Sequence, residues 1–373
     1  MASSDSEILF HTGRQDDPVP GSIGVAVLNR PKALNALNQA MCETLHRLYS
    51  DWEISPDVHA VLLKGAGGKA FCAGGDVKGM VQLLLAGQQD KAISFFRAEY
   101  TLNHMLGTMH MPHIALLDGI VMGGGAGISV HGQFRIATER TVFAMPECGI
   151  GLFPDVGASY FLPRLRGQLG TYLGLTGRRL KGIEVLEAGL ATHFVPSQKL
   201  SQLEDTLHSL GPSARDSGSI GRAIASVQED TPAASELLGE LPAVDACFGH
   251  DRLEDICAAL RQRGDSWAEE TLQNLSKLSP LSQKVTLREV REGAGKPLEE
   301  CLKMEFRMVH HCCAGRTDFI EGVKALLIEK RGQAKWDPAS IEQVTPEMVD
   351  AFFQRVPQEL ELPPRAGRVM AKL

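Results

Sequence analysis

The chain reads Asp118-Gly119-Ile120-Val121-Met122-Gly123-Gly124-Gly125-Ala126-Gly127 immediately after the apolar run His113–Leu117. The apolar run predicts a buried strand, and the glycines predict a turn after it. Glycines at the C-terminal end of a strand leave backbone N–H groups free to face a ligand. This stretch therefore predicts a ligand-binding loop.

Familiar glycine motifs do not explain the loops of this chain. The run Gly65–Ala70 contains a Gly-Lys pair, but Ala70 stands where a P-loop needs Ser or Thr for Mg²⁺. Ile128 takes the third glycine position of a dinucleotide fingerprint. His131 stands where a nucleophile elbow needs glycine. A P-loop, a dinucleotide fingerprint and a serine nucleophile are all disfavoured.

Composition narrows the partner class. The chain has 373 residues, a formal net charge of −7 and 43% hydrophobic residues, which suits one large domain or two smaller ones. No Lys/Arg stripe dominates a long stretch, so we expect no nucleic-acid partner. No apolar run reaches the length of a membrane span, so we expect no membrane partner. An anionic small molecule stays open, because it needs only a local basic lip.

The cysteines indicate reduced thiols in an intracellular protein. Eight cysteines occur without a Cys-x-x-Cys pair or a secretory leader, which is typical of reduced thiols. The run His310-His311-Cys312-Cys313 is the one candidate for a metal cluster. Neighbours on a helix point in different directions, and no second ligand pair lies nearby in the sequence. We therefore expect no metal.

The pattern of apolar runs predicts an α/β fold. Strands are expected at Ile23–Leu28, Val58–Leu63, His113–Leu117 and Phe134–Ala137, and a helix capped by Asn38 is expected to run to about Trp52. Helical patterns dominate after about Pro154, and residues 211–245 form the weakest stretch. The later helices are expected at Arg252–Arg263, Trp267–Lys277, Leu298–Cys313 and Asp318–Lys330.

Four segments in fixed order resemble the crotonase superfamily, also called enoyl-CoA hydratase/isomerase. They are Asn29–Leu37, Lys69–Asp76, Asp118–Gly127 and Phe143–Glu147. The resemblance implies an α/β crotonase (ClpP-like) ββα-spiral core with a helical C-terminal region. We expect the core, with the CoA and oxyanion site, in residues 1–200. A helical insertion or connector would take 201–275, and C-terminal helices and the tail 276–373.

By this resemblance, the glycine loops form an oxyanion hole. Thioester chemistry moves negative charge onto the carbonyl oxygen, and backbone N–H donors aimed there stabilise it. The family positions that match are Gly75 and Gly124. Tight helix–strand packing through small residues would explain one glycine run, but not both runs together with the Glu147 segment.

The resemblance also implies where CoA is held. The matching positions are Lys32 and the Ala33 backbone, with Cys72 and Ala73 beside them. Phosphate contacts are expected from Lys32 or from Lys335, and an ordinary surface lysine is the alternative at both positions. CoA would enter as part of the substrate, so no separate cofactor is expected.

The acid–base residues favour hydrolysis over hydration. A typical enoyl-CoA hydratase carries two glutamates, and one of them corresponds to Gly127 here. The other is present as Glu147. The pattern Phe-Phe-Arg-x-Glu-Tyr, Met-Gly-Gly-Gly, Pro-Glu and Phe-Pro-Asp-Val-Gly resembles the 3-hydroxyisobutyryl-CoA hydrolase branch of the superfamily. Cys148 replaces the Thr that often follows the glutamate.

That resemblance assigns substrate contacts to Glu99, Gly124, Glu147 and Asp155. Glu147 would activate water as a general base, or attack first and form a mixed anhydride. Asp155 and Glu99 would orient the water or the 3-hydroxyl of the substrate. The alternatives are an exposed helical glutamate at position 99 and a turn or helix-cap residue at position 155.

Several choices stay open at this stage. The methyl group that separates 3-hydroxyisobutyryl-CoA from 3-hydroxypropionyl-CoA is worth only about 1–3 kcal/mol of binding free energy, so the sequence does not separate the two substrates. The oligomeric state is also open, and a homo-oligomer is one option. A hydratase or isomerase of fatty-acid oxidation, or a silent scaffold, are the rival functions. The terminal Ala371-Lys372-Leu373 resembles a peroxisomal address. We expect a peroxisomal import receptor as partner, with mitochondrion or cytoplasm as the alternatives.

Overall fold

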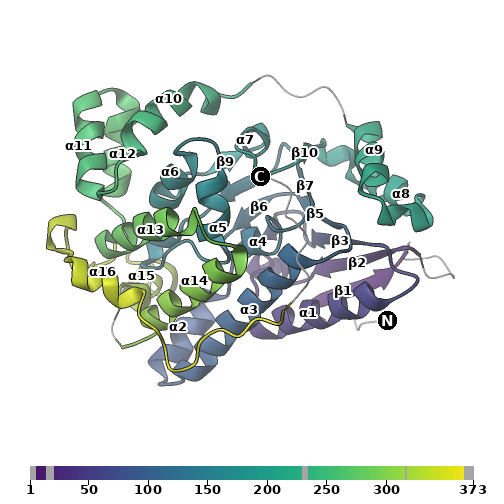
Figure 1. Cartoon of the computed structure of the whole chain (residues 1–373), viewed down its shortest axis with the longest axis horizontal. Coiled ribbons are helices and arrows are strands. Elements are labelled where there is room, and N and C mark those ends of the chain that lie inside the picture. Colours follow the sequence, from purple (N-terminus) through teal and green to yellow (C-terminus); the bar gives the residue numbers. More distant parts are fainter. Residues whose placement is uncertain (1–5, 14–20, 229–233, 316, 365–373) are drawn as a thin grey trace.

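Two β-sheets lie at the centre of the molecule (Figure 1). The computed structural model describes residues 6–13, 21–228, 234–315 and 317–364. The terminal Ala371-Lys372-Leu373 lies outside these described residues. The strands are β1 (Ile8–Thr12), β2 (Ile23–Leu28), β3 (Ala60–Gly65), β4 (Ala70–Cys72), β5 (His113–Leu117), β6 (Ile120–Met122), β7 (Phe134–Ala137), β8 (Val142–Ala144), β9 (Leu180–Lys181) and β10 (His193–Phe194).

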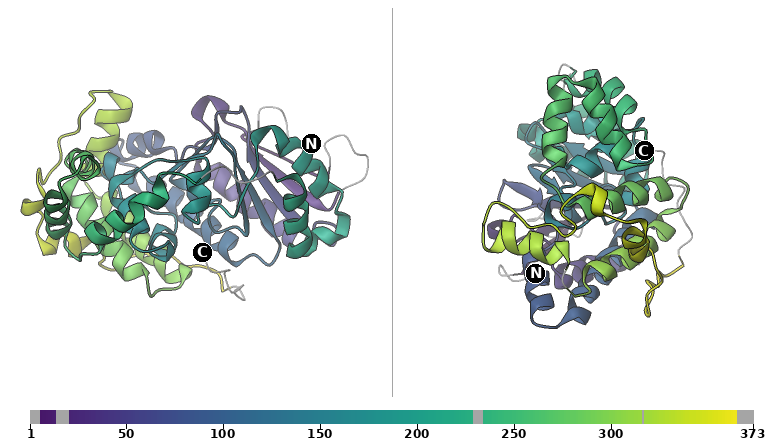
Figure 2. Two further views of the ribbon diagram at one scale, coloured as in Figure 1. Left: turned by 90° about the horizontal axis from the view of Figure 1, so that it is seen from above. Right: turned by 90° about the vertical axis from the view of Figure 1, so that its left-hand side faces the viewer.

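Helices surround both sheets (Figures 1 and 2). They are α1 (Gln39–Ile54), α2 (Val77–Leu85), α3 (Gln89–Thr108), α4 (Gly124–Gly127), α5 (Ala158–Phe161), α6 (Leu169–Thr176), α7 (Ile183–Glu187), α8 (Leu200–His208), α9 (Ser217–Val227), α10 (Leu237–Phe248), α11 (Leu253–Arg263), α12 (Ser266–Leu275), α13 (Pro280–Gly293), α14 (Leu298–Cys312), α15 (Asp318–Val323) and α16 (Pro346–Phe352). Short 3₁₀ turns are η1 (Pro31–Ala33), η2 (Glu147–Ile150), η3 (Leu162–Arg164), η4 (Ser197–Lys199), η5 (Gly211–Arg215) and η7 (Ile341–Gln343), and η6 (Lys324–Ile328) is π-helical.

The chain winds as a spiral that adds one strand to each sheet per turn. The larger sheet has the order β1-β2-β3-β5-β7-β10, and the smaller has the order β4-β6-β8-β9. Thus β3 leads into β4, β5 into β6, and β7 into β8. The strand pairs between these successive turns are parallel. In contrast, β1 pairs antiparallel with β2, and β9 pairs antiparallel with β8. Consequently the loops after β4 and β6 come from neighbouring strands and lie side by side.

The inner strands β2, β3, β5 and β7 of the larger sheet are buried on both faces, which explains their continuous apolar runs. Alternate residues of one strand enter different cores. In β3, Val61 and Leu63 pack in the main core, while Ala60 and Leu62 join a second, smaller core. Helices α8 and α9 supply the other side of that second core.

Most of the expected elements are confirmed. The strands Ile23–Leu28, His113–Leu117 and Phe134–Ala137 occur as expected, and the expected Val58–Leu63 strand runs from Ala60 to Gly65. Asn38 caps α1, because its Oδ1 accepts a hydrogen bond from the Met41 N–H at 2.9 Å. The α/β prediction for the fold class is therefore confirmed.

The last predicted helix is wrong in its second half. An α-helix was expected over Asp318–Lys330, but α15 ends at Val323 and the chain continues as the π-helical turn η6. Lys330 then takes a φ of 54°, outside the right-handed helical region. Periodicity alone does not distinguish a π turn from an α turn, because the two differ by one residue in hydrogen-bond span.

The expected connector region contributes helices in two places. Helices α8 and α9 cover the larger sheet, and α10–α12 pack near α6 and α13 at the opposite end of the molecule (Figure 1). The division into units at 200 and 275 stays a prediction.

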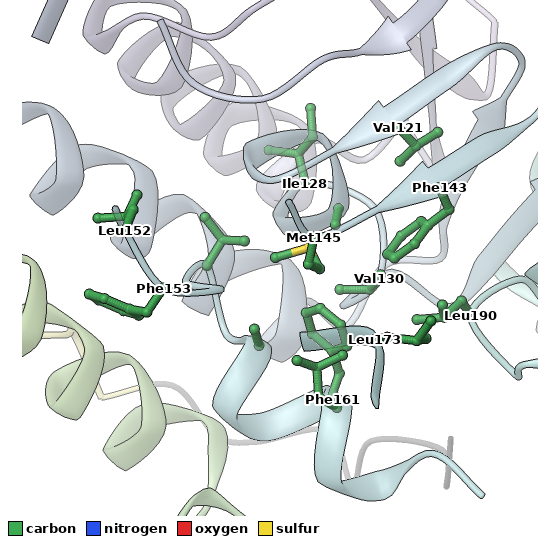
Figure 3. Close-up of a cluster of buried hydrophobic side chains, with 14 of the residues drawn as sticks. Val121, Ile128, Val130, Phe143, Met145, Leu152, Phe153, Phe161, Leu173 and Leu190 are labelled. Carbon is green, nitrogen blue, oxygen red and sulfur yellow. The ribbon is translucent and has the colours of Figure 1, made fainter. Parts of the chain in front are cut away.

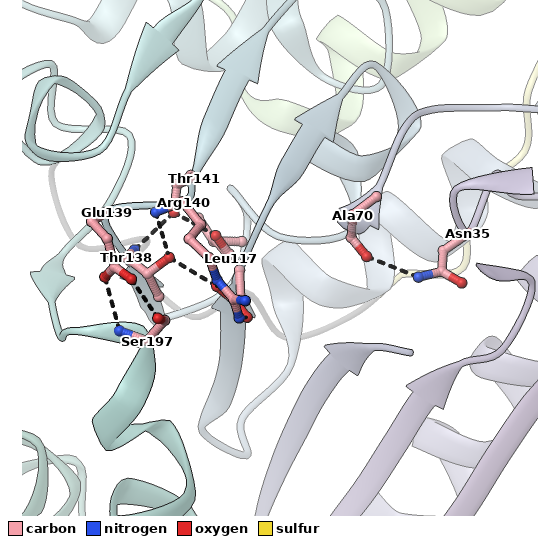
Figure 4. A network of polar contacts seen from close by, with 9 residues as sticks. Asn35, Ala70, Leu117, Thr138, Glu139, Arg140, Thr141 and Ser197 are labelled. Carbon is pink, nitrogen blue, oxygen red and sulfur yellow. Dashed lines mark hydrogen bonds and ion pairs between the residues drawn. The ribbon is translucent and has the colours of Figure 1, made fainter. Parts of the chain in front are cut away.

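Polar contacts fasten the turns that carry the loops (Figure 4). Asn35, at φ 57°, donates from Nδ2 to the backbone oxygens of Ala66 and Ala70, both at 2.9 Å. Its Oδ1 accepts the Arg30 N–H at 3.0 Å. On the next turn of the spiral, the Thr141 hydroxyl donates to the Leu117 carbonyl at 2.5 Å. The hydrogen bonds of Asn35 therefore hold the segment 29–37 against β4.

Candidate active site

The two glycine loops predicted to form an oxyanion hole touch one another. Gly75 follows β4, and Gly124 follows β6 at the start of α4. A Cβ placed on Gly124 would lie 3.2 Å from the Gly75 nitrogen. Within the part of the chain that the structure describes, neither backbone N–H has a hydrogen-bond acceptor. Two free donors on adjoining loops can polarise one carbonyl oxygen.

Three carboxylic acids share a cavity with these loops. The cavity has a volume of about 290 Å³ and contains Glu99, Glu147 and Asp155 in its wall, together with Gly75 and Gly124. All three acids are buried, with exposures of 2%, 5% and 4%. The exposed-glutamate alternative for Glu99 is therefore wrong. The structure brings together every acid singled out in the sequence.

Each acid comes from a different kind of element. Glu99 lies on α3, Glu147 begins η2, and Asp155 lies in the turn before α5. Leu152 and Phe153, between the last two acids, are buried in the same apolar cluster as Met145 and Phe161 (Figure 3). This burial holds the segment from Glu147 to Asp155 against the core.

The glycine loops leave room for the carboxylates. A Cβ on Gly124 would lie only 2.3 Å from Glu99 Oε1, and a Cβ on Gly123 would lie 2.7 Å from Glu147 Oε1. Any side chain at these positions would collide with an acid. Glu99 Oε1 and Glu147 Oε2 are buried and have no hydrogen-bond partner among the described residues, so both acids have capacity left for a ligand.

Tyr100 holds Asp155. Its hydroxyl donates to Asp155 Oδ2 at 2.8 Å, and both groups are buried. The Asp155 side chain therefore does not act as a turn or helix-cap residue. Its carboxylate faces the cavity and accepts its hydrogen bond from Tyr100 on α3.

Burial raises the pKa of all three acids. It raises the pKa of Asp155 to about 7, although the Tyr100 hydroxyl opposes this by favouring the carboxylate. Burial also raises the pKa of Glu147, and the negative charge of Asp155 raises it further. The pKa of Glu99 is raised by burial and then by the charges of Asp155 and Glu147. The three acids titrate as a coupled set, and each is harder to ionise than an ordinary carboxyl.

By the resemblance, Gly127 stands where a hydratase carries its first glutamate, and the neighbours of Gly127 fill that space. A Cβ on Gly127 would lie 2.5 Å from the Val156 Cβ and 2.9 Å from Asn103 Nδ2. Val156 has a φ of 57°, which is unusual for a β-branched residue. The space for a second glutamate is therefore closed.

The expected CoA-contact residues divide into two groups. Ala73 lies in the cavity wall, and its N–H donates to the Leu34 oxygen at 3.0 Å. This contact places the turn with Lys32 and Ala33 next to the cavity, although neither residue lines it. Lys335 does not line it either; its backbone N–H donates to Glu321. Roles for Lys32, Ala33 and Lys335 in phosphate or adenine binding stay predictions.

The cysteines of the chain do not line the cavity. All eight cysteines are buried and free. Burial raises the pKa of the Cys148 thiol to about 12, and its Sγ lies 3.3 Å from Thr286 Oγ1. In the described residues, no group of three or more His, Cys, Asp or Glu is placed to hold a metal ion, and no helix there is long and apolar enough to cross a membrane.

Several residues of the cavity were missed in the sequence. Tyr100 was noted only as part of a motif, and the apolar wall formed by Met80, Phe95 and Leu327 was not identified. Leu327 comes from the π turn η6, more than 170 residues after Asp155 along the chain. No local pattern predicts contacts of that range.

A family comparison agrees with this geometry. A family model described as enoyl-CoA hydratase/isomerase matches residues 23–353. The chain belongs to the enoyl-CoA hydratase/isomerase family. The resemblance inferred from four short segments is therefore confirmed over most of the chain.

Members of this family with curated names are close in sequence. One is "3-hydroxyisobutyryl-CoA hydrolase, mitochondrial" from Xenopus laevis, 48% identical over 89% of this chain and 86% of the relative. The human protein of that name is 46% identical over 90% of this chain and 86% of the relative. The "Probable 3-hydroxyisobutyryl-CoA hydrolase 3" of Arabidopsis thaliana is 46% identical over 94% and 97%.

Solved structures of the family show the same fold. A structure described as a carnitinyl-CoA dehydratase from Mycobacterium thermoresistibile has a TM-score of 0.87 and 35% identity, with 96% of this chain and 99% of that chain covered. An enoyl-CoA hydratase from Rhodobacter sphaeroides 2.4.1 has a TM-score of 0.85 and 32% identity, covering 96% and 100%. The crotonase fold with its helical C-terminal region is thereby confirmed.

Proposed function

We propose that this chain hydrolyses the thioester of 3-hydroxyisobutyryl-CoA to 3-hydroxyisobutyrate and CoA, as the names of its 46–48% identical relatives describe for those proteins. The observation that carries the proposal is the cavity itself. It joins two free glycine N–H groups with three buried acids, and it closes the space that a second hydratase glutamate would need. CoA is part of the substrate, and no further cofactor is required.

In this proposal, Gly75 and Gly124 act on the thioester carbonyl. As the carbonyl carbon becomes tetrahedral, negative charge develops on its oxygen, and the two N–H groups stabilise that charge. One such donor is worth on the order of 10²–10³ in rate. Because both donors are backbone groups, they are already in place before the substrate binds.

Glu147 is the proposed base. It removes a proton from water while the water oxygen attacks the carbonyl carbon, the C–S bond breaks, and the proton passes to the CoA thiolate. The other route is direct attack by a Glu147 oxygen, which expels the thiolate and leaves a mixed anhydride for water to cleave. Repeated turnover in ¹⁸O-labelled water detects the anhydride route when water attacks the Glu147 carbonyl carbon, because only that attack places label in the Glu147 carboxylate.

Glu99 and Asp155 are proposed to hold the acyl group and the water. Both acids retain protons more readily than ordinary carboxyls, so either can donate to, or accept from, the substrate 3-hydroxyl. The apolar wall with Met80, Phe95 and Leu327 suits a short acyl chain. 3-Hydroxypropionyl-CoA lacks only one methyl group, worth about 1–3 kcal/mol, so we expect it to be a slower substrate.

The test is a panel of acyl-CoAs assayed for free thiol. We expect thiol release to be fastest with 3-hydroxyisobutyryl-CoA, followed by 3-hydroxypropionyl-CoA. Crotonyl-CoA, followed by loss of the enoyl absorbance, tests the enoyl-CoA hydratase activity for which the similar protein from Rhodobacter sphaeroides 2.4.1 is named. Hydration faster than hydrolysis would contradict the proposal, and a chain inactive on every compound would favour a scaffold.

The cellular setting is proposed to be valine breakdown in the peroxisome. The terminal Ala371-Lys372-Leu373 supports this, whereas the animal relatives are named mitochondrial, which favours the alternative. Removal of the three residues from a chain with an N-terminal fluorescent tag tests the address. We expect the full tagged chain to enter peroxisomes and the shortened chain to stay outside. Import that continues without the three residues would show that they are not the address, and a full chain that does not enter peroxisomes would end the peroxisomal proposal.

A further inference from the structure

The turn after Asp155 has an unfavourable backbone. Val156 and Gly157 both adopt left-handed conformations, with φ values of 57° and 88°. Glycine tolerates this region, but a β-branched residue disfavours it. Such a conformation persists only where surrounding contacts enforce it. This turn directly follows an acid of the cavity, so whatever enforces it also aims Asp155.

A buried glutamate from the C-terminal helices binds this turn. Glu305 lies on α14 and has no exposed surface. Its Oε2 accepts the Gly157 N–H at 2.7 Å. Its Oε1 accepts the Ser159 N–H at 2.9 Å and the Ser159 hydroxyl at 2.5 Å. Both oxygens are used, by donors on either side of Ala158.

Two further contacts hold the same turn on its other side. The Val156 carbonyl lies 2.8 Å from His131 Nε2, and a carbonyl only accepts, so His131 donates from Nε2. The Val156 side chain packs in the space beside Gly127. Glu305 supplies more polar contacts to the turn than either, and its side chain does not line the cavity.

We infer that Glu305 is a positioning residue, whose carboxylate fixes the left-handed Val156–Gly157 turn and so aims Asp155 into the cavity. Without it, Val156 relaxes toward an ordinary φ, and the Asp155 carboxylate turns away from Tyr100 and the substrate. This inference rests on the proposed function for its kinetic consequence but not for its structural one.

A double-mutant cycle tests the kinetic consequence. Glu305→Gln keeps the size of the side chain and removes one acceptor oxygen. We expect a loss of roughly ten- to hundred-fold in kcat/KM for 3-hydroxyisobutyryl-CoA, the scale found when partners that orient metal-ligating side chains are removed. In an Asp155→Asn background, the same change should cost less than about three-fold, because residues acting through one another are not additive. An equal loss in both backgrounds, or no loss at all, would overturn the inference.

Hydrogen exchange gives a readout independent of activity. In the unaltered chain, the Gly157 and Ser159 amides should exchange slowly, and in Glu305→Gln the peptide that spans them should exchange faster. Leu203→Ala is the matched control, because Leu203 is buried in the second core on the far face of the larger sheet. Equal exchange of the turn in the two variants would overturn the inference that Glu305 holds this turn.

The outcomes remain separable from the proposed function. If the unaltered chain releases no thiol from 3-hydroxyisobutyryl-CoA, the proposed function fails. The exchange result still decides whether Glu305 holds the turn. Ser159→Ala removes one of the three donors and leaves the backbone contacts. It should show a smaller effect than Glu305→Gln on both readouts, and a larger effect would contradict the role of the glutamate.

Discussion

Gly127 and Val156 compete for one space, and this pair separates the chain from a two-glutamate hydratase. The Val156 side chain fills the position from which a glutamate would have to start. Val156 is in turn held at a positive φ next to Asp155. The missing acid and the additional acid are therefore two aspects of one packing arrangement.

Enlarging Gly127 should destabilise the chain without creating a hydratase. Gly127→Ala places a methyl group 2.5 Å from Val156 Cβ, and overpacking of this kind costs about 1–3 kcal/mol. Urea unfolding followed by circular dichroism measures the loss. Gly127→Glu should unfold more easily still and should not hydrate crotonyl-CoA. A gain of hydration would show that the space is open after all.

The charge of Asp155 should set the acid limb of the activity. A general base works only when ionised, so activity is lost as pH falls through the pKa of Glu147. Burial and the Asp155 charge both raise that pKa. We expect the limb well above the ordinary carboxyl range. Asp155→Asn removes one cause, so the limb of its residual kcat/KM should move to lower pH. A limb that stays in place or moves to higher pH would contradict this assignment.

At the scale of elements, the π turn η6 closes one side of the cavity. It brings Leu327 into the wall beside the acids, and helix α2, which supplies Met80 to the same wall, packs against η6. Single-turn π segments occur frequently at functional sites. A residue more than 170 positions after Asp155 thus limits the space for the acyl group.

Leu327→Ala should relax the selectivity for short acyl chains. The lost side chain enlarges the cavity, so a longer 3-hydroxyacyl-CoA should gain about ten-fold in kcat/KM relative to 3-hydroxyisobutyryl-CoA, on the scale of one or two methylenes. Competition assays with both substrates measure the ratio. Leu272→Ala, on the distant helix α12, is the control. An unchanged ratio in Leu327→Ala would remove η6 from the description of the pocket.

The sequence was informative where local patterns decide structure. The strand His113–Leu117 and the Asn38 cap follow from burial on both faces and from a side-chain oxygen before a helix. Glu99, Glu147 and Asp155 were found through motifs. Tyr100, Glu305 and Leu327 act through contacts between distant segments, which no periodicity records. The π turn was missed because it differs from an α-helix by a single residue.

At the scale of the whole molecule, a group of acids is buried between the spiral core and the C-terminal helices. Besides the three in the cavity, Glu289 on α13 and Glu305 on α14 have no exposed surface. Burial raises the pKa of Glu305 to about 8, opposed by the donors from Ser159 and Gly157. The pKa of Glu289 is raised by burial and then by the charges of Glu305, Asp155 and Glu147. These groups link the acidity of the site to the stability of the fold.

The contribution of these acids to stability should therefore fall as pH rises. A raised carboxyl pKa means that the folded chain keeps a proton which the unfolded chain has lost, so the free energy of unfolding decreases above the unfolded-state value of about 4.3. Glu289 is the clearest case, because neither of its oxygens has a partner among the described residues. Glu289→Gln should stabilise the chain at pH 8 by on the order of 1–3 kcal/mol, with the gain shrinking toward pH 4.

Unfolding of both chains in urea at several pH values checks this. A gain that does not depend on pH would mean that Glu289 is not protonated in the folded state. A loss at pH 8 would mean that the carboxylate is stabilised by a contact that the amide does not reproduce.

The central claim is that Glu147 and the two glycine loops hydrolyse a 3-hydroxyacyl thioester. The most direct test is thiol release from 3-hydroxyisobutyryl-CoA by the unaltered chain and by Glu147→Gln, with CoA binding measured in parallel by calorimetry. We predict rapid release by the first, loss of release in the second, and CoA affinity that is the same in both. Full turnover by Glu147→Gln would contradict the account.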